Sequence, residues 1–140
     1  MKCGTVIYDK RYQFSNGEVI DKLLIVLCEF GRDHLVLTTT TSRPEKRERT
    51  PGCQIHKKPP AFFLPKGSCW FDKDTWVELH NVNELPSIIY NQKKKDGTVI
   101  EHETVLSVEL MKQILDCVLH SEFIDGYYLD RLKRVREQLS

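Results

Sequence analysis

The feature that most constrains this chain is a series of short segments rich in apolar and β-branched residues, each about the length of one strand. In chain order they cover residues 5–8, 23–28, 35–41, 62–64 and 70–79. Only the turn at residues 30–33 joins the second segment to the third. Because so short a connection permits antiparallel pairing but not a parallel crossover, we expect an antiparallel sheet. The order and spacing of the segments predict a small, mainly β barrel.

Helical periodicity begins near the C-terminus. Ser107 is a suitable N-cap for a helix. The apolar residues that follow it recur at helix spacing, namely Leu110, Met111, Ile114, Leu115, Val118 and Leu119. After Gly126, residues 127–139 carry a second apolar stripe, which predicts a second helix.

Residues 88–102, before these helices, have the pattern of a hairpin. Asp96-Gly97 lies between two short apolar stretches, and Asp-Gly suits a type I′ turn because both central residues need positive φ. We therefore expect all 140 residues to form a single domain, since the length allows one core. The barrel should cover about 4–104 and the C-terminal helices about 107–139.

Charge is balanced over the whole chain but not locally. With 21 basic and 20 acidic residues, 40% hydrophobic content and a net charge of +1, the composition is that of a globular protein and does not indicate wholesale nucleic-acid binding. Residues 43–60 combine four prolines with many basic side chains, which predicts an irregular basic loop. No apolar run reaches the ~20 residues that cross a bilayer, and the first residues lack the order of a secretion signal. We expect a cytoplasmic protein.

The five cysteines are odd in number, and none forms a Cys-x-x-Cys pair. This usage predicts free thiols in a reducing compartment. Cys28 and Cys117 fall in apolar runs, so we expect them in the core. Cys53, His56 and Cys69 offer three zinc ligands, but a fourth is missing and the spacing matches no common zinc pattern. We therefore predict no metal site and no cofactor.

A run of hydroxyls ends the strand predicted at 35–41 and continues into Ser42, while the preceding strand begins beside Lys22. In an antiparallel pair the start of one strand lies beside the end of the next, so Lys22 is expected close to Thr41 and Ser42. A cation beside hydroxyl donors can hold a phosphate. The same residues are equally compatible with a solvated lysine and with threonines that serve β propensity or turn capping.

In their order, these segments resemble the MazF/PemK family of toxins from toxin–antitoxin systems. The matching stretches are Gly4 to Tyr8 for the opening strand, Asn16-Gly17-Glu18 to Lys22 for a loop with Gly and Glu, Leu24 to Leu27 for the next strand, Leu35 to Ser42 for the strand ending in Thr-Ser, Phe71 to Leu79 for the Asp-Ser/Thr strand, and Leu106 to Phe123 for the final helix. The resemblance covers most of residues 4–42 and 71–124. No single motif is specific, and the ordered set carries it.

The resemblance implies a mainly β, small SH3-like (MazF/PemK/CcdB-like) barrel with C-terminal α-helices, acting as a homodimer with a proteinaceous antitoxin. It also implies a metal-independent endoribonuclease that cleaves single-stranded RNA to 2′,3′-cyclic phosphate and 5′-OH ends. The catalytic residues it implies are Lys22, Thr41 and Ser42. The RNA-binding residues it implies are Glu18, Arg43, Lys46, Arg47, Arg49, Asn81 and Asn83.

Two departures from the family fall at this site. The family's Arg-Pro is Lys22-Leu23 here, and its Gln-x-Arg is Asn81-Val82-Asn83. Lysine provides a point charge but not the planar fork with which arginine holds a phosphate. Two alternatives therefore stay open. One is a catalytically silent SH3-like module that binds nucleic acid or protein, and the other is a growth-arrest toxin directed at DNA gyrase.

Overall fold

The computed structural model describes residues 1–41, 48–55, 60–68, 71–121 and 124–139. In chain order its elements are β1 (Thr5–Gln13), β2 (Val19–Phe30), β3 (Asp33–Thr40), β4 (Gly52–Gln54), β5 (Ala61–Leu64), β6 (Thr75–Leu85), α1 (Ser87–Lys95), β7 (Val99–Val105), α2 (Val108–Leu119) and α3 (Gly126–Gln138). Strands predominate and helices come last, so the prediction of a mainly β chain with C-terminal helices is confirmed. No helix in the described ranges is long and apolar enough to span a membrane.

The strands form one antiparallel sheet in the order β4-β5-β6-β3-β2-β1-β7. β1, β2 and β3 pair in succession, β6 then adds to β3, and β7 adds to β1. The predicted pairing of the segments at 23–28 and 35–41 is confirmed, with Ile25 opposite Leu37. Within the described ranges the edge strands β4 and β7 do not pair with each other, so the sheet is open rather than closed on itself.

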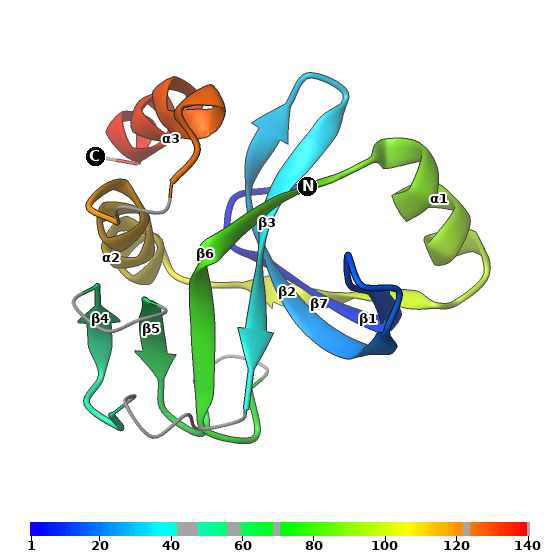
Figure 1. Ribbon diagram of the computed structural model, residues 1–140, viewed down its shortest axis with the longest axis horizontal. Helices are drawn as coiled ribbons and strands as arrows, with labels where there is room; N and C mark the ends of the chain where they lie inside the picture. The colour runs from blue at the N-terminus through cyan, green and yellow to red at the C-terminus, as the bar shows by residue number, and fades with distance from the viewer. Residues whose placement is uncertain (42–47, 56–59, 69–70, 122–123, 140) are drawn as a thin grey trace.

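β6 joins the two parts of the sheet because it is long and irregular. Its first residues pair with β5, as in Val77 opposite Phe62, and it pairs with β3 along most of its length. Between Leu37 and Thr39 of β3 the register shifts, and the partner on β6 changes from Val82 to Val77. Extra residues on one strand of a pair bend that strand and increase its twist. Figure 1 shows β6 running from the β4–β5 end of the molecule to the start of α1.

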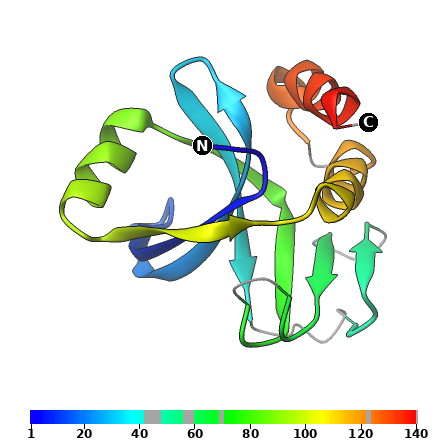
Figure 2. The ribbon, with the colours of Figure 1, turned by 180° about the vertical axis from the view of Figure 1, so that it is seen from behind.

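Both faces of the central strands are covered, and α1 lies at the opposite end of the molecule from α2 and α3 (Figures 1 and 2). In β2, Ile25 and Leu27 belong to a core that also includes side chains of α2 and α3. Leu24 and Val26 belong to a second cluster, with Tyr90 of α1. A strand buried on both faces has a continuous apolar sequence. This is why β2 shows no polar alternation in its buried part.

The hairpin predicted at 88–102 is wrong. Ser87–Lys95 form helix α1, and β7 begins after one turn. That turn is a Schellman motif, in which the Thr98 N–H donates to the carbonyl of Lys93 at 2.8 Å across Gly97 at a φ of 76°. Asp-Gly therefore ends a helix here. The signal was ambiguous because a glycine at positive φ serves a helix C-terminus as well as a hairpin.

The C-terminal helices begin within one residue of their predicted starts. The Ser107 hydroxyl caps α2 by accepting the N–H of Leu110 at 3.1 Å, as predicted. The Asp125 carboxylate caps α3 by accepting the N–H of Tyr127 at 2.9 Å. Each helix then buries an apolar stripe in the core that lies against β2 and β3.

Two of the cysteines predicted to be free are joined. Cys53 of β4 and Cys117 of α2 form a disulfide, with their Cα atoms 5.7 Å apart. Cys117 and Cys28 are buried, as predicted, and Cys28 and Cys3 are free thiols. The pairing follows from tertiary packing, because β4 and α2 lie side by side (Figure 1) although these two cysteines are 64 residues apart in sequence.

Candidate functional site

A cleft of about 770 Å³ lies where the start of β2 meets the end of β3 and the approach to β6. We refer to it as the strand-end cleft. Its lining residues are Tyr8, Ile20, Asp21, Lys22, Leu23, Thr39, Thr40, Thr41, Asp72, Lys73 and Thr75. The antiparallel register that pairs Leu24 with Thr38 brings Lys22 and Thr41 to this cleft, as the sequence led us to expect.

Lys22 is held on the cleft wall rather than extended into solvent. Its Nζ donates to the carbonyl of Thr39 at 2.8 Å and lies 3.9 Å from Glu78 Oε1. It also lies 5.6 Å from the centroid of the Phe14 ring, within cation–π range. Only 12% of the side chain is exposed. The ammonium therefore has a defined position, and because it carries three N–H donors it can contact a ligand in addition to Thr39.

Glu78, on β6, is a neighbour of Lys22 that the sequence did not predict, and it lies behind the residues that line the cleft. Its side chain is 16% exposed, and Thr38 Oγ1 donates to its Oε1 at 3.3 Å. Its carboxylate partly balances the charge of Lys22. The signal that points to it is the mixture of polar and apolar residues at 74–79, which is typical of a strand with one wet face.

The hydroxyls of the cleft wall differ in what they contact. Thr39 Oγ1 donates to the carbonyl of Leu23 at 2.8 Å, and Thr75 Oγ1 donates to the carbonyl of Lys73 at 3.0 Å. Both threonines are buried, so their hydroxyls serve the backbone. Thr41, just beyond the end of β3, is exposed. It is therefore better placed than Thr39 or Thr75 to contact a ligand.

Charges of both signs line the rim of the cleft. The Tyr8 hydroxyl donates to Asp21 Oδ2 at 3.0 Å, and this hydrogen bond raises the pKa of Tyr8 above its ordinary value. Asp72 and Lys73 are exposed on the segment that leads into β6. Sequence reasoning missed these residues because their segments are far apart in sequence and meet only in the folded chain.

Of the four cations predicted to bind RNA, Arg49 is the one that lies in the described part of the chain. Its Nε lies 3.4 Å from Asp74 Oδ2, and 61% of its side chain is exposed. Asp74 is itself anchored, because its Oδ1 accepts the N–H of Lys66 at 2.9 Å. Since Asp74 lies between Lys73 and Thr75 of the cleft lining, this ion pair places Arg49 beside the rim.

The structure does not bring two other predicted residues to the cleft. Glu18 is exposed in the turn between β1 and β2, where its N–H donates to Asn16 Oδ1. Asn83 lines a different cleft, because the bent strand β6 carries it toward α1. The predicted residues that lie outside the described ranges are Ser42, Arg43, Lys46 and Arg47, and Asn81 is described only as part of the strand β6.

A second cleft, of about 580 Å³, lies beside α1, and two of its charged side chains, Asp9 and Lys93, are paired with each other. Asp9 is 1% exposed, and its Oδ2 lies 2.8 Å from Lys93 Nζ. Its Oδ1 accepts the N–H of Arg11 at 3.0 Å, and Lys93 also donates to the carbonyl of Arg11 at 3.2 Å. Burial makes these contacts strong. The pair therefore joins α1 to β1 and is a poor candidate for binding a ligand.

No family model and no curated protein sequence matches this chain. Within the described ranges, no three His, Cys, Asp or Glu side chains are grouped as metal ligands. Cys53 belongs to the disulfide, and His56 and Cys69 lie outside those ranges. What the strand-end cleft offers is a positioned ammonium and an exposed hydroxyl, which can donate hydrogen bonds to an anion, and nearby carboxylates, which can accept a proton.

Proposed function

We propose that this chain binds single-stranded RNA in the strand-end cleft and cleaves it without a metal ion, as the toxin of a type II toxin–antitoxin pair of the MazF/PemK kind. The observation that supports this is that Lys22 and Thr41 line one cleft. We also propose a more specific fold class, in which the strands of this open antiparallel sheet have the arrangement of an SH3-like barrel. It is supported by the order of the elements, since the β1–β2–β3 meander comes first and helices come last.

The reaction transfers one phosphate between two oxygens of the RNA. The 2′-hydroxyl attacks the neighbouring phosphorus, the bond from phosphorus to the 5′-oxygen breaks, and the products are a 2′,3′-cyclic phosphate and a 5′-OH. Negative charge grows on the phosphate oxygens in the transition state, and Lys22 with Thr41 and Ser42 would donate hydrogen bonds there. Glu78 would accept the proton of the 2′-hydroxyl, and Lys22 would protonate the leaving 5′-oxygen.

Basic side chains near the cleft would hold the rest of the RNA. Lys73 is exposed on the rim and Arg49 is paired beside it with Asp74. Arg43, Lys46 and Arg47 precede Arg49 in sequence and would extend this basic track. Because each phosphate contact releases counterions, we expect the affinity for RNA to fall steeply with salt.

The proposal includes a homodimer and a proteinaceous antitoxin, acting in the cytoplasm. Two exposed apolar residues at the start of β2 support a protein-binding surface: Val19 is 47% and Ile20 is 40% exposed. Ile20 also lines the cleft. A partner that covers Ile20 would therefore obstruct RNA entry, which is a simple way for an antitoxin to inhibit.

A second candidate is a catalytically silent module that binds nucleic acid or protein. The observation that favours it is the engagement of the Lys22 ammonium with the Thr39 carbonyl and Glu78, which leaves less of its charge available to a phosphate. In the family that the sequence resembles, an arginine occupies the position of Lys22. A lysine cannot make the bidentate contact with a phosphate that an arginine makes.

Incubation of the purified chain with a defined single-stranded RNA in EDTA, followed by mapping of the fragment ends, separates the two candidates. The proposal predicts 2′,3′-cyclic phosphate and 5′-OH ends. Lys22→Ala should slow cleavage at least about 100-fold, the usual effect of removing one transition-state donor. The matched control, Lys133→Ala on the exposed side of α3, should leave the rate unchanged. RNA that is bound but not shortened would select the silent module. RNA that is neither bound nor cleaved would refute the nuclease and the RNA-binding form of the silent module.

A further inference from the structure

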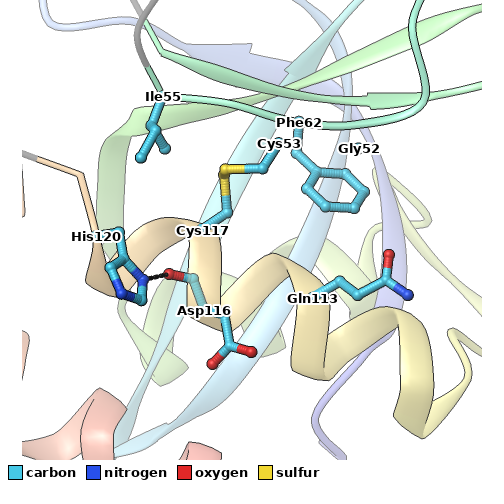
Figure 3. A pocket seen from close by; sticks show the side chains of 8 residues that line it. All are labelled: Gly52, Cys53, Ile55, Phe62, Gln113, Asp116, Cys117 and His120. Atoms are coloured by element: carbon cyan, nitrogen blue, oxygen red, sulfur yellow. Dashed lines mark hydrogen bonds between the residues drawn. A yellow bond between two sulfur atoms is a disulfide. The ribbon is translucent and has the colours of Figure 1, made fainter.

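A pocket of about 300 Å³ lies against the Cys53–Cys117 disulfide, between β4 and α2. Figure 3 shows the S–S bond crossing from β4 to α2, with His120 on one side of it and Phe62 on the other. The pocket shares no lining residue with the strand-end cleft. The disulfide is therefore a separate feature from the proposed RNA site.

The two halves of the disulfide differ in exposure. Cys53 lies on an edge strand and is exposed, whereas Cys117 is 2% exposed on the buried side of α2. Thiol–disulfide exchange requires a thiolate to reach one sulfur and to displace the other. We therefore expect an external thiol to approach from the side of Cys53, so that the Cys117 sulfur is the one displaced.

The free thiols in the described ranges are poorly suited to the same chemistry. Burial raises the pKa of Cys3 to about 11, and burial also raises the pKa of Cys28. The thiolate is the reactive form, so neither residue ionises readily at neutral pH. Neither free thiol therefore attacks the disulfide readily, and among these four cysteines only the disulfide can react with a small external thiol.

We propose that Cys53 is a thiol-exchange site at which a low-molecular-weight monothiol such as glutathione opens the disulfide. The thiolate sulfur forms a bond to Cys53 Sγ, the Cys53–Cys117 bond breaks, and Cys117 leaves as a thiolate that takes up the proton lost by the incoming thiol. The result is a mixed disulfide on Cys53 and a free thiol on Cys117, with no net oxidation. A second monothiol can release Cys53 by attacking the external sulfur.

Opening the bond should detach β4 from α2 without unfolding the chain. β4 keeps its pairing with β5, and the neighbouring segment keeps other anchors. Gln54 Nε2 donates to the carbonyl of Glu48 at 2.7 Å, and Trp76 Nε1 donates to the same carbonyl at 3.1 Å. The event is therefore a local opening, which requires less free energy than global unfolding.

The experiment uses the full chain purified without reductant. It is exposed to graded concentrations of reduced glutathione, quenched in acid, alkylated and digested, and the cysteines are assigned by mass spectrometry. We expect glutathione on Cys53 and alkylation on Cys117. Because the thiol takes part in the step, tenfold more glutathione should speed opening about tenfold.

Two variants serve as controls. Cys117→Ser leaves Cys53 as an exposed thiol and should acquire glutathione from oxidised glutathione at Cys53. Cys53→Ser leaves Cys117 buried and should remain unmodified there under the same conditions. Three results would overturn the proposal: purified protein in which Cys53 and Cys117 are both free, glutathione found on Cys117 instead of Cys53, or an opening rate that does not respond to glutathione concentration and equals the rate of global unfolding.

Discussion

The two edges of the sheet are held in different ways. At one edge β7 follows α1 after a single turn, and side chains complete the contact. Lys93 of α1 pairs with the buried Asp9 of β1, and the Tyr90 hydroxyl donates to Glu101 of β7. At the other edge a disulfide joins β4 to α2 across 64 residues of sequence. Both contacts close long loops, since Lys93 and Asp9 are 84 residues apart. The difference is that one edge is held by an ion pair and hydrogen bonds, whereas the other has a covalent link.

Removal of the disulfide should cause the largest loss of stability among the changes that test this comparison of the two edges. In the double variant Cys53→Ser/Cys117→Ser the unfolded chain regains the entropy of a loop of 64 residues, which corresponds to about 4 kcal/mol at room temperature in the chain-entropy model. We expect a loss of that order in the free energy of unfolding, measured by urea denaturation. Cys3→Ser, at a free thiol, should change it little. Equal midpoints for the double variant and the parent chain would show that the link contributes nothing to stability.

Loss of the Lys93–Asp9 ion pair, at the edge beside α1, should cause the second-largest loss of stability. Lys93→Met leaves the carboxylate of Asp9, which is 1% exposed, without its ammonium partner. Removing one member of a buried pair typically destabilises by about 3 kcal/mol or more, and the same urea assay measures it. Lys95→Met is the matched control, because Lys95 is exposed on the same helix. If the two variants were equally stable, the pair would not be what anchors α1.

Lys22 lies between the two edges, so its replacement tests function more than stability. Lys22→Ala should lower RNA cleavage at least about 100-fold, equivalent to about 2.7 kcal/mol of transition-state stabilisation. The thermal midpoint should move by only a few degrees, because the pair with Glu78 is long at 3.9 Å. Calorimetry and a fluorescent RNA substrate would measure the two effects. Full cleavage activity in this variant would remove Lys22 from the mechanism.

The smallest effect is expected at His34, in the middle of the sheet. Burial lowers the pKa of His34, and the amino group of Met1, 3.1 Å from its Nε2, lowers it further. The unfolded chain therefore binds the proton more readily, so stability should fall as the pH drops below the ordinary histidine pKa of about 6.5. Solvent screens this partly exposed ring, which limits the effect to below about 1 kcal/mol.

Denaturation of the parent chain and His34→Gln at neutral pH and at about pH 5 would measure that difference. The parent should lose more stability on acidification than the variant does. His120→Gln is a suitable control, because His120 is exposed at the end of α2. An identical loss in the parent and in His34→Gln would show that this imidazole does not contribute to the pH dependence.

Local patterns were sufficient for much of the fold and for part of the site. The apolar run at 23–28 and its short turn to 35–41 predicted the β2–β3 pair, and the same antiparallel geometry predicted that Lys22 and Thr41 would lie together. Ser107 predicted the start of α2. These features depend on residues close together in sequence, whose backbone preferences and side-chain periodicity act with little influence from the rest of the chain.

Tertiary structure alone decided the features that join distant segments. Glu78 meets Lys22 because β6 returns to β3, and Cys53 meets Cys117 because β4 packs on α2. The stretch that begins at Ile88 became helical because a Schellman turn and the burial of Tyr90 outweighed its β propensity. Such outcomes depend on which surfaces are buried against each other, and a local sequence pattern does not contain that information.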